Sequence, residues 1–241
     1  MFEFLTNFFN VLLYQPLFNS LVLLYNYLPG HDFGIAIIFL TIVIRIIIYP
    51  LSVKALNSQK ALQALQPKMQ EIQKKYKDNK EQLAKETLEL YRKEKISPFS
   101  GLFLALIQLP ILIALYSVFW KGLNPEELAN LYSFVSNPGQ INSIFLGIID
   151  LSKANLLLAV LVGIFQFFQT KMLTPKNIPG QGKNSDISQI MQKQMVYFFP
   201  FLTVFILMSL PSAIGLYWIV SGIFSIIQQY FILKKIEPVK Q

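Results

Sequence analysis

Long apolar segments alternate with short polar ones along the whole chain. Because a membrane-spanning helix needs about 20 mostly apolar residues, five segments predict spans: 33–51, 98–120, 155–173, 195–210 and 212–233. The last two are separated only around Pro211, which predicts a tight hairpin. Gln108 and Pro110 interrupt the second span and predict a kink. The pattern predicts an all-α polytopic membrane protein with five transmembrane helices.

The first segment, 1–30, is apolar but interrupted. Glu3, Thr6, Asn7 and Asn10 recur at i, i+3, i+4 and i+7, which places them on one helix face. We therefore predict a helix that lies in the membrane interface, broken near Pro16 and ended by Pro29-Gly30. An additional, weakly hydrophobic span is the alternative, because an apolar stretch of this length fits either kind of helix.

The segment 54–95 is the one predicted soluble element. Its apolar residues step by three and four, as in a coiled coil, at Leu62, Leu65, Met69, Ile72 and Tyr76, and again at Leu83, Thr87 and Leu90. Pro67 predicts a kink or a restart of the first helix. Asp78-Asn79 predicts a turn in which Asp78 caps the second helix. This predicts an antiparallel helical hairpin, which either only connects two spans or forms a contact surface for anionic lipid or a protein partner.

Positive charge is distributed unevenly. The formal net charge is +8. Eleven Lys and Arg lie within 54–95, four lie within 171–193 and three lie within 234–241, whereas the loop 121–153 has only Lys121 and Lys153. The positive-inside rule explains this balance more simply than direct nucleic-acid binding does. It predicts a cytoplasmic hairpin, an outside N-terminus and a cytoplasmic C-terminus.

The remaining composition gives no support to enzyme chemistry. The mean hydropathy is +0.47 and 54% of the residues are hydrophobic. The chain has no Cys and a single His, His31, next to Asp32, so no clustered set of metal ligands is visible. No phosphate-binding loop or nucleophile motif appears. We expect no catalysis, no metal and no cofactor.

Arg45 is the most informative residue, because it is a charge inside the first apolar span. A charge at the centre of a spanning helix costs about 3 kcal/mol on translocon scales, and the predicted spans contain no Asp or Glu. Arg45 lies six residues before Leu51, about 9 Å along the helix. It either extends inward along lipid or faces a water-filled groove. The polar residues of other spans favour the groove, and Thr41 shares its helix face.

The chain resembles the YidC/Oxa/Alb family of membrane protein insertases. The resemblance covers nearly the whole chain in order, through TIVIRIIIYPLS, LQPK, LALIQLPILIALY, FLGIIDLSK, FFQTKM and LPSAIGLYWIVSGIFSIIQQ. It implies a five-span core around a positively charged groove that opens to the cytoplasm and to lipid. Polar positions together with the resemblance give the expected groove residues, which are Thr41, Arg45, Gln108, Gln166, Gln169, Tyr217, Trp218 and Ser221. The resemblance implies a hydrophobic slide for substrate at Leu109 and Leu112.

The expected function is insertion of short-tailed membrane proteins into the bacterial inner membrane, alone or with the Sec translocon. The expected partners are nascent membrane proteins and lipid, with the ribosome and the signal recognition particle machinery as further candidates. Two departures from the family bear on this. We expect a core without the large extracytoplasmic domain that many Gram-negative members have before it, and we expect no ribosome binding through a long basic tail, because KKIEPVKQ is short. The alternatives are a small-anion transporter or channel that uses Arg45 and a scaffold that only assists helix assembly.

Overall fold

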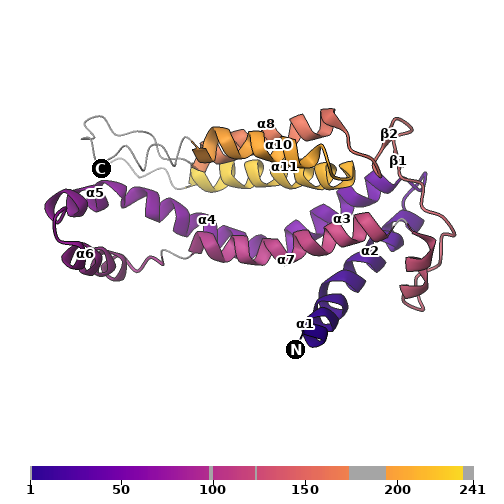
Figure 1. Ribbon diagram of the computed structural model, residues 1–241, viewed down its shortest axis with the longest axis horizontal. Helices are drawn as coiled ribbons and strands as arrows, with labels where there is room; N and C mark the ends of the chain where they lie inside the picture. The colour runs from indigo at the N-terminus through magenta and orange to yellow at the C-terminus, as the bar shows by residue number, and fades with distance from the viewer. Residues whose placement is uncertain (1, 98–99, 123, 174–193, 236–241) are drawn as a thin grey trace. The chain divides into compact units, whose positions relative to one another are not determined.

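The computed structural model describes residues 2–97, 100–122, 124–173 and 194–235, and most of them are helical (Figure 1). Lys176, Lys183, Lys193 and Lys240, which contribute to the predicted charge asymmetry, lie outside this range. The chain divides into two compact units. One unit comprises Met1–Ile47 with Leu109–Gln228, and the other comprises Ile48–Gln108 with Gln229–Gln241.

The first unit begins with one helical rod built from α1 (Phe2–Phe9), a π-helical turn (Asn10–Tyr14) and α2 (Gln15–Tyr27). The break predicted near Pro16 is wrong. The Gln15 amide donates to the Asn10 carbonyl, five residues back, and Pro16 occupies the first turn of α2. Proline has no N–H to donate, and the wider turn lets the helix continue past it. The helix Thr6–Tyr27 is long and apolar enough to cross a membrane, so both an interfacial and a spanning placement stay open.

Helix α3 spans Phe33–Ile47 and carries Arg45 in its last turn. It begins where the Asp32 carboxylate accepts a hydrogen bond from the Ile35 amide at 3.0 Å, which satisfies one of the unpaired N–H groups of a helix start. Helix α4 (Tyr49–Ala64) follows directly, with Pro50 in its first turn. Because Pro50 cannot donate to a carbonyl of the preceding turn, α3 ends inside the predicted span 33–51.

Four further helical segments are α7 (Ser100–Lys121), α8 (Leu156–Leu173), α10 (Phe199–Leu207, preceded by the π-helical turn Gln194–Phe198) and α11 (Ser212–Lys235). Within the described residues, Ser212–Ile232 is also long and apolar enough to cross a membrane, whereas three apolar helices are shorter: Leu106–Lys121, Leu156–Met172 and Gln194–Leu207. The chain is therefore mostly helical and rich in apolar helices. The arrangement of five spans around a groove stays a prediction.

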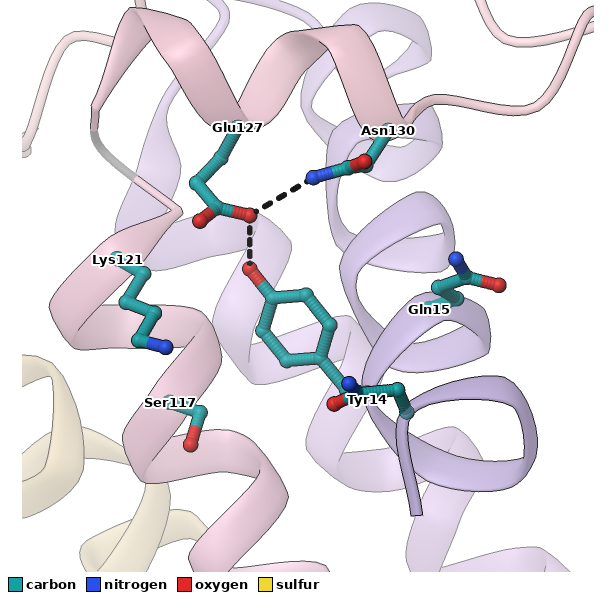
Figure 2. Close-up of a pocket in the computed structure, with 7 residues that line it drawn as sticks. Tyr14, Gln15, Ser117, Lys121, Glu127 and Asn130 are labelled. Carbon is teal, nitrogen blue, oxygen red and sulfur yellow. Dashed lines mark hydrogen bonds between the residues drawn. The ribbon is translucent and has the colours of Figure 1, made fainter. Parts of the chain in front are cut away.

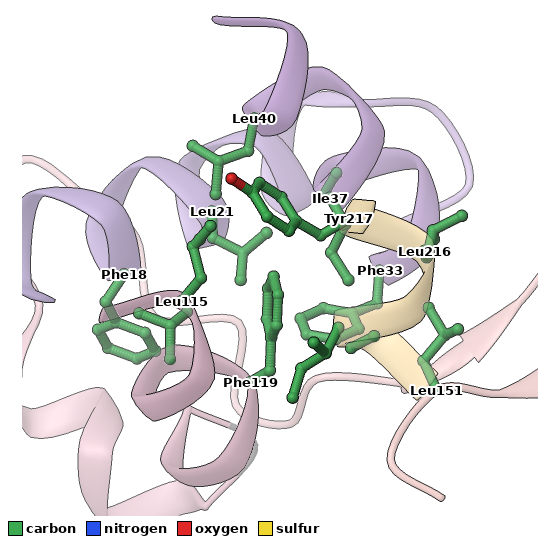
Figure 3. Close-up of a cluster of buried hydrophobic side chains, with 14 of the residues drawn as sticks. Phe18, Leu21, Phe33, Ile37, Leu40, Leu115, Phe119, Leu151, Leu216 and Tyr217 are labelled. Atoms are coloured by element: carbon green, nitrogen blue, oxygen red, sulfur yellow. The ribbon is translucent and has the colours of Figure 1, made fainter. Parts of the chain in front are cut away.

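Small residues let these helices approach closely, which is how apolar helices associate in membranes. Helix α8 packs along α10, and a side chain added at Gly163 would meet Val204 Cγ2 at 2.5 Å. Helix α11 also contacts α8, where Gly215 faces Leu158. The buried cluster in Figure 3 joins α2, α3, α7 and α11, and the rings of Phe33 and Phe119 meet edge to face at 6.3 Å between centroids.

The connection between α7 and α8 folds against α2 and α3. It contains a 3₁₀ turn (Pro125–Asn130) and a short antiparallel hairpin of β1 (Ile144–Phe145) with β2 (Ile149–Asp150). The buried Asn19 side chain accepts a hydrogen bond from the Tyr132 amide at 2.6 Å. Asp32 accepts one from the Leu146 amide at 2.7 Å. These side-chain bonds fix an otherwise irregular loop onto the helices.

Asp150 holds the end of the β-hairpin. It accepts hydrogen bonds from the Ser152 hydroxyl and amide and from the Ser143 hydroxyl, and it pairs with Lys153 at 3.1 Å. These bonds, those from Ser152 foremost, hold the pKa of the Asp150 carboxyl well below its ordinary value. The charged carboxylate thus stabilises the folded loop above the unfolded pKa of about 3.9, and this stabilisation is lost as the pH falls from there toward the lower folded pKa.

We therefore expect Asp150→Asn to be less stable than the parent at pH 6 and to lose less stability between pH 5 and pH 3. The measurement is thermal unfolding in detergent at these pH values. Asp78→Asn, which removes a carboxylate from the turn between α5 and α6, is the matched control. Equal acid sensitivity of Asp150→Asn and the parent would contradict the role of this carboxylate.

In the second unit, α4 is followed by α5 (Gln66–Lys75) and α6 (Lys80–Lys93). The two helices form an antiparallel pair, because the Tyr76 hydroxyl bonds Glu86 near the turn and Lys68 bonds Glu94 far from it. Helix α5 begins at Gln66 with Pro67 in its first turn, so the predicted kink or restart at Pro67 takes the form of a new helix. The predicted cap at Asp78 is wrong. Asn79 is the N-cap, and its side chain accepts a hydrogen bond from the Gln82 amide.

Candidate functional site

Arg45 lies near the end of α3 with its side chain partly buried. Its Nε atom is buried and has no hydrogen-bond partner. The nearby group that interacts electrostatically with the guanidinium is the Tyr217 phenol of α11. Among the described residues, the buried polar side chains include no carboxylate. The Nε donor is therefore held without an acidic partner among the described residues.

Helix α11 carries a buried polar stripe that includes Tyr217. Tyr217, Ser221, Ser225 and Gln228 follow at steps of four, four and three, and all are buried. Such spacing keeps one face of a helix, so the polar side chains point inward rather than to lipid. The Ser221 hydroxyl is buried without a hydrogen-bond partner. Trp218, next to the stripe, is partly buried and packs against the apolar core.

The other predicted groove residues differ in their surroundings. Thr41 is buried, and its hydroxyl donates to the Ile37 carbonyl at 2.6 Å within α3, so its hydrogen-bonding need is met locally. Gln166 and Gln169 lie partly buried on α8, and Gln108 lies partly buried on α7. The structure thus brings Arg45 close to Tyr217, while a shared groove for all eight residues stays a prediction.

The two residues of the predicted hydrophobic slide are not equivalent. Leu109 on α7 is 52% exposed. Leu112, almost one helical turn later, is partly buried and packs against the apolar core. Of this pair, Leu109 offers the freer contact surface to another chain.

Sequence reasoning missed several buried polar residues and one polar cavity. The buried residues are Asn19, Ser52, Thr203, Ser212 and Gln229. The cavity, of about 230 Å³, is lined by Asn10, Tyr14, Gln15, Ser117, Lys121, Glu127 and Asn130. In Figure 2 the Tyr14 hydroxyl donates to Glu127 Oε2 at 2.8 Å, and Asn130 Nδ2 donates to the same oxygen at 3.1 Å. The sequence signal was the acidic pair Glu126-Glu127 in a loop, but nothing local connects it with Tyr14.

The Ser221 hydroxyl, buried without a hydrogen-bond partner, allows a test of whether the polar stripe of α11 contributes to the stability of the fold. A buried polar group without a hydrogen bond costs about 1–3 kcal/mol, so Ser221→Ala should leave the unfolding temperature unchanged or raise it. Thr41→Val, which removes a bonded hydroxyl at similar volume, should lower it. Thermal unfolding in detergent measures both. A marked loss of stability in Ser221→Ala would show that the hydroxyl has a structural partner.

Comparison with known proteins gives a consistent result. The family model described as "60Kd inner membrane protein" matches residues 23–240. A protein of Fusobacterium nucleatum named "Membrane protein insertase YidC" is 36% identical over 204 residues, which are 85% of this chain and 87% of that protein. "Membrane protein insertase YidC 1" of Halalkalibacterium halodurans is 35% identical over 83% of this chain and 70% of its own length. A third relative, from Endomicrobium trichonymphae, is also named "Membrane protein insertase YidC" and is 36% identical to the chain. The chain spans only 38% of the length of that protein.

Proposed function

The chain belongs to the family of the 60Kd inner membrane protein, and from this membership we propose that it is an insertase that guides short-tailed membrane proteins from the cytoplasm into the bilayer. The observation that carries the mechanism is the buried Arg45 Nε without a hydrogen-bond partner. A buried donor without a partner carries a free-energy cost, so binding of a ligand that supplies a hydrogen-bond acceptor is favoured.

The physical problem for a substrate is its polar tail. In hydrocarbon each unsatisfied backbone group costs several kcal/mol, so a tail cannot cross a bilayer unaided at a useful rate. We propose a hydrated groove between Arg45 on α3 and the polar stripe of α11, in which Thr41, Gln108, Gln166, Gln169 and Trp218 contribute further polar contacts. Such a groove shortens the distance over which the tail lacks hydrogen-bond partners.

Arg45 acts in this scheme by attracting acidic residues of the tail. At an effective dielectric constant of about 20, two unit charges about 4 Å apart interact by roughly 4 kcal/mol, and a partly buried pair is screened little by salt. The apolar span of the substrate meanwhile moves along Leu109 and Leu112 and leaves sideways into lipid. Transfer of apolar surface out of water supplies the free energy, so the scheme contains no covalent step and no nucleotide.

We further propose that the α5–α6 hairpin lies in the cytoplasm and receives the substrate. The segment 54–95 that contains it carries eleven of the 21 Lys and Arg of the chain, and the positive-inside rule favours this side. The delivery partners that fit this position are the Sec translocon, the ribosome and the signal recognition particle machinery. The N-terminus lies outside and the C-terminus inside in the same scheme.

The test is reconstitution of the purified protein in liposomes with a single-span substrate that carries an acidic tail. We expect tail protection from added protease to rise well above that in protein-free liposomes. No gain in protection would contradict autonomous insertion and favour a scaffold that needs a partner. Flux of a small anion that depends on Arg45 would instead favour the transporter alternative.

A further inference from the structure

The polar cavity of Figure 2 holds two opposite charges that do not meet. Lys121 lies in the last turn of α7 and Glu127 on the following 3₁₀ turn, and both line the cavity. Among the described residues, Lys121 forms no ion pair, because the two ion pairs found there involve Lys68 and Lys153. A lysine and a glutamate that border one small cavity without pairing provide separate sites for an anion and a cation.

The carboxylate is held in a fixed orientation. Tyr14 and Asn130 both donate to its Oε2 atom, and the Tyr14 side chain is only 7% exposed. In Figure 2 the other carboxylate oxygen receives no hydrogen bond from the residues drawn. The cavity volume of about 230 Å³ far exceeds the roughly 10–15 Å³ that one water needs, so a polar group of several heavy atoms fits.

Aromatic residues beside the cavity indicate its depth in the membrane. On α7, Tyr116 and Trp120 stack with ring centroids 5.8 Å apart and are 38% and 54% exposed. Each directly precedes a residue that lines the cavity, Ser117 and Lys121. Because exposed Tyr and Trp gather at the level of lipid headgroups, the cavity lies where a headgroup can enter it.

We propose that this cavity binds the headgroup of a zwitterionic phospholipid with a primary ammonium group, the phosphoethanolamine class. Lys121 and the Ser117 hydroxyl take the phosphate, and the second oxygen of Glu127 accepts a hydrogen bond from the ammonium. Phosphocholine is a weaker ligand because its nitrogen has no N–H to donate. A phosphoglycerol headgroup is weaker because it has no cation for Glu127.

The experiment uses Trp120 as the reporter. The chain has two tryptophans, so Trp218→Phe leaves one fluorophore beside the cavity. In this background the purified protein in detergent is titrated with short-chain phosphatidylethanolamine, phosphatidylcholine, phosphatidylglycerol and soluble phosphoethanolamine. Lys121→Gln and Glu127→Gln are the test variants. Lys85→Gln, on the exposed face of α6, is the matched control for loss of a positive charge.

We expect phosphatidylethanolamine to bind about tenfold more tightly than phosphatidylcholine or phosphatidylglycerol. Lys121→Gln and Glu127→Gln should each lower the affinity for phosphatidylethanolamine about tenfold. Lys85→Gln should leave this affinity unchanged. Equal affinities for phosphatidylcholine and phosphatidylethanolamine in the parent background would overturn the proposal. This comparison needs no further variant, so it holds even if Lys121→Gln or Glu127→Gln fails to fold. Soluble phosphoethanolamine binding as tightly as the lipid would overturn the assignment of a lipid ligand. Unchanged affinity in both variants would place the lipid elsewhere.

Discussion

Arg45→Ala is expected to lower insertion of a substrate with an acidic tail by at least tenfold, while Arg45→Lys keeps most of the activity. Loss of the charge removes an attraction of roughly 4 kcal/mol between partly buried groups, and about 1.4 kcal/mol already corresponds to a tenfold change in rate. Lysine supplies a point charge without the planar fork of arginine. The measurement is the initial rate of protease-protected insertion into proteoliposomes.

Two controls separate the charge of Arg45 from other effects. Lys153→Ala removes the same charge from an exposed pair in the loop after β2, and such surface pairs contribute about 1 kcal/mol or less, so its rate should match the parent. A substrate whose tail carries amides in place of carboxylates should be inserted equally by the parent and Arg45→Ala. Equal rates of all variants on the acidic tail would reduce Arg45 to a structural residue. Failure of Arg45→Lys alone would argue for two-point recognition by the guanidinium.

The helical elements and the inward polar face of α11 could be predicted because they depend on local periodicity. Tyr217, Ser221 and Ser225 are four residues apart, and this spacing alone places them on one face. The missing hydrogen bonds of Arg45 and Ser221 could not be predicted. Whether a buried atom finds a partner depends on the packing of helices that lie far apart in the sequence, and periodicity says nothing of that packing.

Contacts between distant segments account for the remaining differences. The hydrogen bond between Tyr14 and Glu127 joins residues 113 positions apart, so the cavity beside them left no local signal. The continuous helix through Pro16 depends on a π-helical turn just before it, and a proline in a sequence indicates a break more often than such a turn. The choice between Asp78 and Asn79 as the N-cap shifts a helix start by one residue, which is within the usual uncertainty of helix boundaries.

Gly34→Ala is expected to destabilise the protein by about 1–3 kcal/mol, the usual range for an overpacked site. A β-carbon at Gly34, near the start of α3, would lie 2.1 Å from Cδ2 of Phe145 in β1. The absence of a side chain at this position therefore lets the β-hairpin rest on α3. Thermal unfolding in detergent measures the loss. Gly215→Ala is the control, because the nearest atom there is Leu158 Cβ at an ordinary 3.6 Å.

The decisive comparison repeats Gly34→Ala in a Phe145→Gly background, because the β-carbon of Phe145 also lies only 2.9 Å from the new methyl group. Without that side chain the three nearest atoms are gone, and alanine favours a helix over glycine by up to about 1 kcal/mol. The same substitution should then be neutral or stabilising, so its effect changes sign between the two backgrounds. An equal loss of stability in both backgrounds would mean that the two positions do not interact. A reversal would instead establish that the hairpin is held on α3 by the contact between Phe145 and the bare backbone of Gly34, which no periodic pattern in the sequence reveals.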